Sequence, residues 1–261
     1  MIPAVPHLVA GLDFPPIGEL LNWKNIGPGG FNKTALIDVL AVALTLGLFF
    51  HAARRKAMVP RGTQNIAESL IEFVNGQIIM ETMGADGLGY LPFILAIFCF
   101  VFLCNIFEII PIFQFPADAR MANPLVLALI VWGVYNYAGI KRQGFRAYVR
   151  NSTIPPGVPG FLVPLVAVIE GAQRFLLNPL TLAIRLFANM LAGHLLLVTF
   201  ALMADALFFH NTVTATIPIG VLPVLMEIVI IIFEVLIAVL QAFIFAILTG
   251  VYLGPSLHPE H

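Results

Sequence analysis

The chain has 261 residues, of which 60% are hydrophobic and only 10% are charged, and its mean hydropathy is +0.97. Soluble globular domains carry about 25% charged residues, so this composition indicates an integral membrane protein. The net charge of −1 offers no polycationic surface, so a nucleic-acid partner is not expected.

Alternating apolar and polar segments predict one membrane domain behind a short exposed segment. Residues 1–33 are rich in Pro, Gly and Asn and are expected to be irregular and exposed to water. Residues 63–84 are amphipathic at helical spacing but too polar to span, so we expect them to lie at the membrane interface. Within the membrane domain, residues 34–261, the expected spans are 34–53, 90–113, 122–141, 161–209 and 213–253.

The last two apolar regions are longer than an upright span requires. Residues 224–253 would form a helix about 45 Å long, against a hydrocarbon core of about 30 Å. The region 161–209 is also too long, and Pro164 and Pro179 are candidate kinks. We therefore expect an all-α integral membrane protein with about five transmembrane helices and one interfacial amphipathic helix, the last two spans being long and steeply tilted.

Clusters of Lys and Arg predict the orientation in the membrane. One cluster follows the first span, within residues 54–61, and the other lies in a basic loop after the third span, residues 141–150. Both connections should be cytoplasmic because basic residues accumulate on that side. Five spans then place the N-terminus outside and the C-terminus in the cytoplasm.

Arg185 lies in an apolar run, and a central arginine costs about 2.5–3.5 kcal/mol on insertion scales. A structural arginine paired with a neighbouring helix is one reading, but charges inside the membrane usually serve function. At 100° per residue, one helical stripe holds several polar residues while His194 points to the opposite face. The stripe consists of Arg174, Asn178, Arg185 and Asn189. Two polar stripes back to back indicate that this helix separates two polar environments.

The last span carries Glu227, Glu234 and Gln241 at intervals of seven, which places them on one face. Such groups are costly in lipid unless they meet water or each other, although interhelical hydrogen bonds worth about 0.6 kcal/mol each are an alternative. Asn105 and Glu108 are neighbours on the second span. Glu108 could also lie simply near the outer interface.

The chemistry of these residue types favours proton movement. Glutamate and histidine can exchange protons near neutral pH, while asparagine and glutamine can hold ordered water. Arginine keeps its charge and so acts as a fixed positive barrier. Glu170 could take part or could be a simple helix-end charge near the cytoplasmic surface. The sequence has no phosphate-binding glycine loop and no i, i+4 histidine pair, so neither a cofactor nor a metal is expected.

Three segments carry a resemblance to a known family. Residues 177–194, with the core R-L-F-A-N-M, and residues 234–253 closely resemble the signature segments of subunit a of F-type ATP synthase. Residues 105–111 resemble a polar segment of the same family. The order of five spans, with an interfacial helix after the first, matches over nearly the whole chain.

The resemblance implies a non-catalytic stator subunit that offers two offset half-channels to the carboxylates of a rotating c-ring. It implies that Arg185 is the essential arginine separating the half-channels. Further implied partners are b-type subunits of the peripheral stalk, membrane lipid and protons, in a bacterial cell membrane, with sodium as the coupling ion left open. The residues expected to serve proton translocation are Arg185, Asn189, His194, Glu234, Gln241, Glu108, Asn105, Glu227, Glu170 and Arg174.

Two other classes of protein compete with this reading. A secondary transporter would show internal repeats and paired broken helices, and the sequence shows neither. A purely structural membrane scaffold would tolerate substitution of Arg185 and Glu234.

Overall fold

A computed structural model describes residues 33–54, 61–110, 121–154, 159–208 and 217–257. The expected exposed segment, apart from Lys33, lies outside the described residues. The elements are α3 (Lys33–Arg54), α4 (Thr63–Val74), η1 (Asn75–Ile79), α5 (Met80–Thr82), η2 (Gly84–Tyr90), α6 (Leu91–Ile109), α7 (Ala122–Gln143), α8 (Phe145–Thr153), α9 (Val163–Ala172), η4 (Gln173–Leu177), α10 (Asn178–Phe208) and α11 (Ile217–Leu257).

Among the described residues, five helical stretches are long and apolar enough to cross a membrane, which confirms the predicted all-α membrane fold. The stretches are Thr34–Arg54, Gly84–Ile109, Ala122–Gln143, Val163–Asp205 and Val221–Leu257. Large apolar side chains such as Leu46, Val126 and Phe161 are exposed on the outside of the bundle. In lipid this exposure carries no hydrophobic cost, because the surrounding acyl chains are equally apolar.

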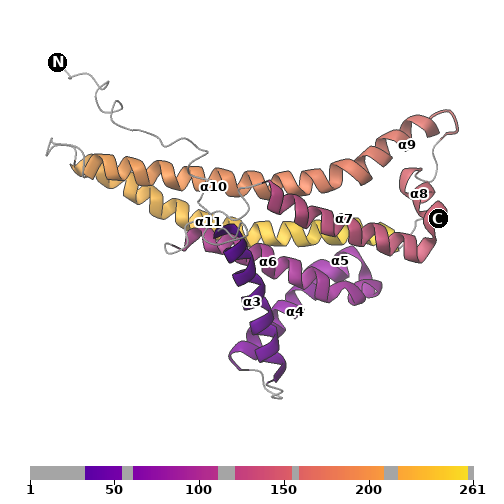
Figure 1. The fold of residues 1–261 in the computed structure, drawn as a ribbon, viewed down its shortest axis with the longest axis horizontal. Coiled ribbons are helices and arrows are strands. Elements are labelled where there is room, and N and C mark those ends of the chain that lie inside the picture. Colours follow the sequence, from indigo (N-terminus) through magenta and orange to yellow (C-terminus); the bar gives the residue numbers. More distant parts are fainter. Residues whose placement is uncertain (1–32, 55–60, 111–120, 155–158, 209–216, 258–261) are drawn as a thin grey trace, which may run out of the picture.

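The two long helices dominate the shape of the molecule. Figure 1 shows α10 and α11 side by side along its longest axis, whereas α3 runs across that axis. The 41 residues of α11 make it about 60 Å long, roughly twice the thickness of a hydrocarbon core. If α3 stands upright in the membrane, the long pair must be strongly inclined, as its length already requires.

The basic connection after the third span differs from the expected loop. It is helical: α7 continues to Gln143, and α8 follows directly after Gly144, whose φ of 81° favours glycine. Tyr148 holds α8 in place, since it is buried and its hydroxyl donates to Asn136 Oδ1 at 2.9 Å. The sequence prediction was wrong here because the short helix depends on a tertiary contact with α7.

A π-helical turn, η4, joins α9 to α10. The amide of Asn178 donates to the carbonyl of Gln173, an i to i−5 bond. Pro179 follows directly; it has no amide hydrogen and its ring crowds the carbonyl four residues earlier, which favours an enlarged turn at this point. The π-turn adds about one residue and so shifts the helix register by about 100°. Positions on either side of η4 therefore do not keep the α-helical phase.

The interfacial segment and the last helix also differ in detail from the expectation. Residues 63–82 form α4, the π-turn η1 and α5, and a 3-10 helix, η2, then leads into α6. The final helix continues through Gly250 and ends only at Leu257. The main buried core joins η1, α6, α7, α10 and α11, and its largest members include Ile78, Tyr135 and Phe245.

Candidate functional site

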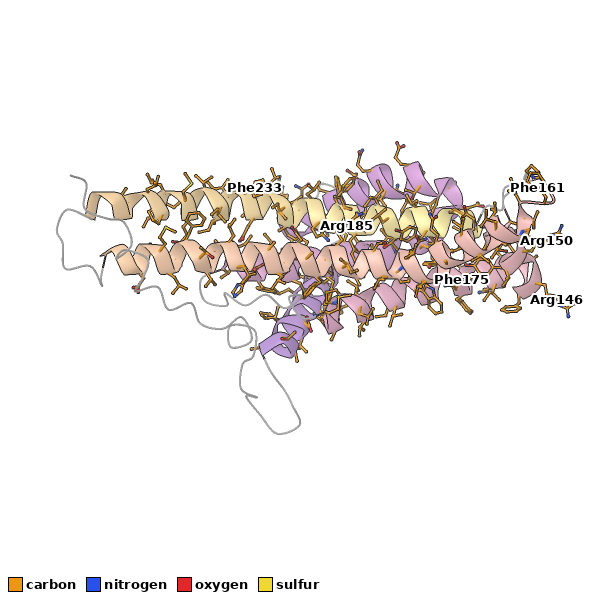
Figure 2. All side chains as sticks on the ribbon, turned by 90° about the horizontal axis from the view of Figure 1, so that it is seen from above. Arg146, Arg150, Phe161, Phe175, Arg185 and Phe233 are labelled. Atoms are coloured by element: carbon orange, nitrogen blue, oxygen red, sulfur yellow. The ribbon has the colours of Figure 1, made fainter. Side chains whose placement is uncertain are left out.

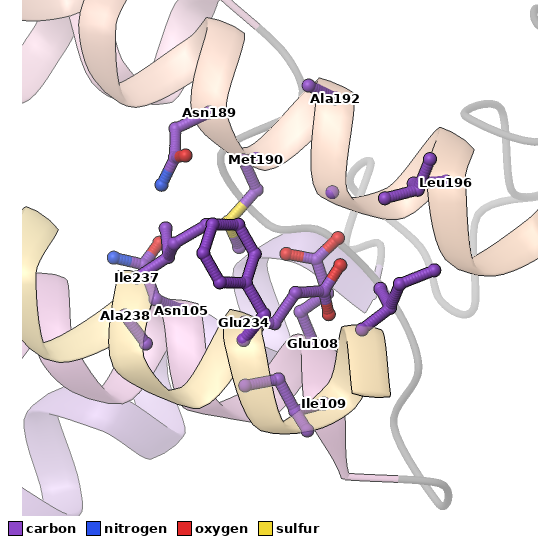
Figure 3. Close-up of a pocket in the computed structure, with 13 residues that line it drawn as sticks. Asn105, Glu108, Ile109, Asn189, Met190, Ala192, Leu196, Glu234, Ile237 and Ala238 are labelled. Atoms are coloured by element: carbon purple, nitrogen blue, oxygen red, sulfur yellow. The ribbon is translucent and has the colours of Figure 1, made fainter. Parts of the chain in front are cut away.

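A cavity of about 230 Å³, the first cavity, lies between α6, α10 and α11, and its largely apolar wall carries Asn105, Glu108, Asn189 and Glu234. Asn105 and Glu108 reach it from α6, Asn189 from α10 and Glu234 from α11, and the two carboxyl groups point into the same space (Figure 3). Three helices therefore contribute residues that the sequence analysis had selected separately. The cavity has room for several water molecules, each of which takes about 30 Å³ in the liquid.

His194 lies beside the first cavity and contacts Glu108. Its Nδ1 atom is 3.6 Å from Glu108 Oε1, and both residues are buried. This contact joins α10 to α6. It also places a histidine and two glutamates within one group, which is a suitable arrangement for passing protons.

Glu234 lies unusually close to the backbone of α10. A Cβ atom added to Gly193 would be only 2.8 Å from Glu234 Oε1, so the glycine allows this approach. Neither carboxyl oxygen of Glu234 has a hydrogen-bond partner among the described residues, and the same holds for both amide atoms of Asn105. Buried polar atoms in this situation are normally satisfied by ordered water. In the first cavity, Glu108 and Asn189 offer such water further polar partners beside these atoms.

The second cavity has a volume of about 210 Å³ and lies toward the other end of the long helices. Glu170, Gln173, Arg174 and Asn178 line it from α9, η4 and α10. The remaining lining residues come from α7, α8 and α11 and are Tyr135, Ser152, Val251, Tyr252 and Pro255.

Arg174 is fixed at the wall of the second cavity by three neighbouring elements. Its Nη2 donates to Ser256 Oγ at 2.8 Å, and its Nε donates to Tyr148 Oη at 3.3 Å. The guanidinium carbon lies 5.2 Å from the Tyr148 ring centroid and 5.9 Å from that of Tyr135, within range of a cation–π attraction. The Tyr135 hydroxyl in turn donates to the Arg174 carbonyl at 2.6 Å.

Arg185 lies on the surface of α10 (Figure 2), between Asn178 of the second cavity and Asn189 of the first along the helix. Ala183 and Met190 lie on the buried side of the helix, about 160° and 140° around it from Arg185, and Arg185 itself is exposed. Within the described part of the chain no hydrogen bond or ion pair holds its guanidinium. Asn189 of the first cavity is about 6 Å away along the helix axis, and Asn178 of the second cavity about 10 Å on the opposite side.

The expected common stripe of Arg174 and Arg185 is wrong. The eleven-residue interval would align them in a continuous α-helix, but η4 lies between and shifts the phase. Arg174 consequently turns to Ser256 and Tyr148 while Arg185 stays on the exposed surface. Pro164 falls in the first turn of α9, where proline is tolerated, whereas Pro179 follows the π-turn η4 inside the continuous helical stretch and so accompanies its irregularity.

The other residues expected to serve proton translocation lie at different places in the structure. Glu170 and Arg174 line the second cavity. Gln241 is buried on α11 two turns beyond Glu234, and its Nε2 lacks a hydrogen-bond partner among the described residues. Glu227 is half-buried two turns before Glu234, and it lines neither of the two cavities.

Sequence reasoning missed the partners of Arg174. Tyr135, Tyr148 and Ser256 are polar residues in or near helices, but nothing in their spacing connects them with residue 174. Ser256 is 82 residues away from it in the chain. Only the packing of α7, α8 and α11 around η4 brings them together.

The fold and the two cavities define a multi-span α-helical membrane protein with ionisable residues held inside its transmembrane bundle. The sequence model of the ATP synthase A chain family matches residues 35–254, and the chain belongs to this family. This finding confirms the resemblance drawn from the signature segments.

Bacterial relatives match over nearly the whole chain. It is 40% identical to the ATP synthase subunit a of Frankia alni over 246 residues, which cover 92% of this chain and 84% of the relative. It is 41% identical to that of Rhodococcus erythropolis over 249 residues, covering 95% and 89%. It is 34% identical to that of Rhizobium etli over 255 residues, covering 98% and 93%.

Proposed function

We propose that this chain is the proton-translocating stator subunit a of a rotary F-type ATP synthase. It is non-catalytic and spans a bacterial cell membrane, with the N-terminus outside and the C-terminus in the cytoplasm. The observation that carries the proposal is the position of Arg185, exposed and without a partner among the described residues, between two separate cavities that each contain ionisable residues. Family membership supports the membrane subunit itself.

The first cavity is the outer half-channel in this proposal. Glu227 lies toward the outer end of α11 and receives protons, which then pass to the group formed by Glu108, His194 and Glu234. Asn105 and Gln241 hold the water that connects these groups, because both amide atoms of Asn105 and Nε2 of Gln241 are buried without partners among the described residues. Asn189, at the α10 side of the cavity, faces the point of transfer to the c-ring.

Arg185 separates the two pathways. A protonated carboxyl group of the c-ring can turn through lipid because neutralisation removes most of its desolvation cost. After nearly a full rotation the carboxylate is ionised and passes the guanidinium, which stabilises its charge. Because arginine does not release its proton, it also blocks direct proton transfer between the cavities.

The second cavity is the inner half-channel. Glu170 accepts the released proton, and Arg174, held by Ser256, places a fixed positive charge at the wall of the cavity. Each proton that crosses the membrane releases about 2.3 kcal/mol per 100 mV, so several are needed for each ATP. The c-ring and b-type stalk subunits are the partners that this mechanism requires.

Arg185→Ala tests the proposal. We expect coupled ATP synthesis and ATP-driven proton pumping in inverted membrane vesicles to be lost. The amount of the subunit in the membrane should stay unchanged, because Arg185 is exposed and makes no hydrogen bond or ion pair with the described residues. Arg185→Lys should also fail, since a desolvated ammonium can lose its proton and lacks the planar fork.

Arg146→Ala is the matched control, because Arg146 is an exposed arginine on α8, outside both cavities. Normal pumping by the Arg185→Ala variant would refute the assigned role. Co-purification with a small, very hydrophobic ring-forming subunit separates this function from that of a transporter or a scaffold.

A further inference from the structure

The cytoplasmic half of α11 approaches the interfacial segment more closely than any larger side chain would allow. A Cβ atom at Gly250 would lie 2.4 Å from Thr82 Oγ1, and one at Gly254 would lie 2.6 Å from the Thr82 carbonyl oxygen. Both glycines are buried, and α11 contacts η1, α5 and η2 along this side. Small residues spaced four apart allow such close contact between helices in membranes.

The opposite side of the same helical turn forms part of the second cavity. Val251, Tyr252 and Pro255 line the cavity. Ser256, which is fully buried, accepts the hydrogen bond from Arg174, and its carbonyl accepts one from Gln143 Nε2 at 3.1 Å. At 100° per residue, Tyr252 points about 200° away from Gly250. Thr82 and the second cavity therefore flank α11 from opposite sides.

We propose that Thr82, Gly250 and Gly254 are positioning residues that set the distance between α11 and the second cavity, so that Ser256 reaches Arg174. The glycines let α11 pack directly against Thr82. Because protein interiors are packed as densely as organic crystals, a change at this contact displaces α11 with little relaxation of the surrounding side chains. The importance of this placement for proton release rests on the function proposed above.

An added methyl group should move α11 toward the cavity. At Gly250 the contact with Thr82 Oγ1 must open from 2.4 Å to the 3.4 Å of ordinary contact, a displacement of about 1 Å. The Arg174–Ser256 hydrogen bond of 2.8 Å cannot keep its geometry through such a shift. The two glycines differ in one respect: Gly250 meets the Thr82 side chain, whereas Gly254 meets the Thr82 backbone.

This difference defines the experiment, which compares Gly250→Ala and Gly254→Ala, each with and without Thr82→Gly, in the whole ATP synthase complex. Gly133→Ala is the matched control, because a Cβ atom there meets nothing within 4 Å. We expect Gly133→Ala to behave as the unmodified complex. Each of the other two alanine variants should lose about tenfold in proton pumping per assembled complex, since displacements of about 1 Å can cost up to a hundredfold.

Thr82→Gly should restore the Gly250→Ala variant, because it removes the side chain that the new methyl group meets. It should not restore Gly254→Ala, because the carbonyl remains. If either alanine variant fails to assemble, the same pattern of rescue is expected in the amount of assembled complex. Equal rescue of both variants, rescue of neither, or normal pumping by Gly250→Ala would overturn the proposal.

A second measurement reports cavity geometry without relying on proton transport. Gln173→Cys places a thiol at the exposed lining of the second cavity, and its labelling by a charged thiol reagent from the cytoplasmic side measures access. Gly250→Ala should slow this labelling and Thr82→Gly should restore it. Unchanged labelling would overturn the positioning role. If the selective rescue of labelling is observed while Arg185→Ala pumps normally, the positioning is correct and the proposed function has failed.

Discussion

The Gly193→Ala variant tests how strongly proton transfer depends on the position of the Glu234 carboxyl group. The added Cβ would lie 2.8 Å from Glu234 Oε1, and ordinary contact begins at 3.4 Å, so the oxygen must move by at least about 0.6 Å. The variant gains about 0.5–1 kcal/mol because alanine is the better helix former, and a strained glutamate rotamer costs about 0.5–1.5 kcal/mol. These contributions nearly cancel, so assembly should be unaffected.

Proton transfer should respond much more strongly than stability. Transfer between groups requires hydrogen-bond reach, and small misplacements of reacting groups can reduce rates by one to two orders of magnitude. We expect passive proton conduction through vesicles stripped of the catalytic sector to fall about tenfold. Gly133→Ala, on α7, is the control because its added methyl group meets nothing within 4 Å. Unaltered conduction by a fully assembled Gly193→Ala complex would show that the close approach of Glu234 to α10 has no role in transport.

Three further changes test other parts of the site. Glu234→Gln keeps the shape but removes the exchangeable proton, so pumping per assembled complex should fall by at least about a hundredfold; activity close to that of the unmodified complex would exclude Glu234 from the pathway. Asn105→Leu removes two buried amide atoms without partners among the described residues, so the thermal stability in detergent should hold or rise while pumping slows; a marked loss of stability would contradict this reading. Asn123 Nδ2 on α7 donates to Asp38 Oδ1 on α3 at 2.9 Å. A double-mutant cycle with leucine at each position, measured by unfolding in detergent, should give a coupling free energy of about 0.6 kcal/mol and at most about 1.7 kcal/mol. Additive effects of the two substitutions would show that this hydrogen bond does not stabilise the contact between α3 and α7.

The positions of the spans could be predicted because the energies that select them are local. A stretch of about 20 apolar residues is stable in a bilayer whatever its neighbours are. A single arginine within such a stretch is expensive enough to make Arg185 a candidate functional residue without any structure. The placement of His194 and Arg185 on opposite faces of α10 also follows from helical geometry, because no irregular turn lies between these two residues.

The environment of Arg174 could not be predicted in the same way. Its phase relative to Arg185 depends on the π-turn η4, and a proline in the sequence indicates an irregularity without specifying its form. The sequence likewise predicts a loop where α8 forms, because this short helix is stabilised by burial of Tyr148 against α7 rather than by its own propensity.

The sequence by itself determined that this protein is a membrane-spanning helical bundle, which spans it contains, and which ionisable residues lie within them. These properties depend on the transfer of each residue from water to lipid, and that free energy is paid segment by segment. Only the tertiary structure decided that the polar residues gather in two separate cavities with Arg185 between them. Residues such as Glu108, His194 and Glu234 lie on three different helices, and the helix packing that brings them together depends on contacts, such as Gly193 against Glu234, between positions far apart in the chain.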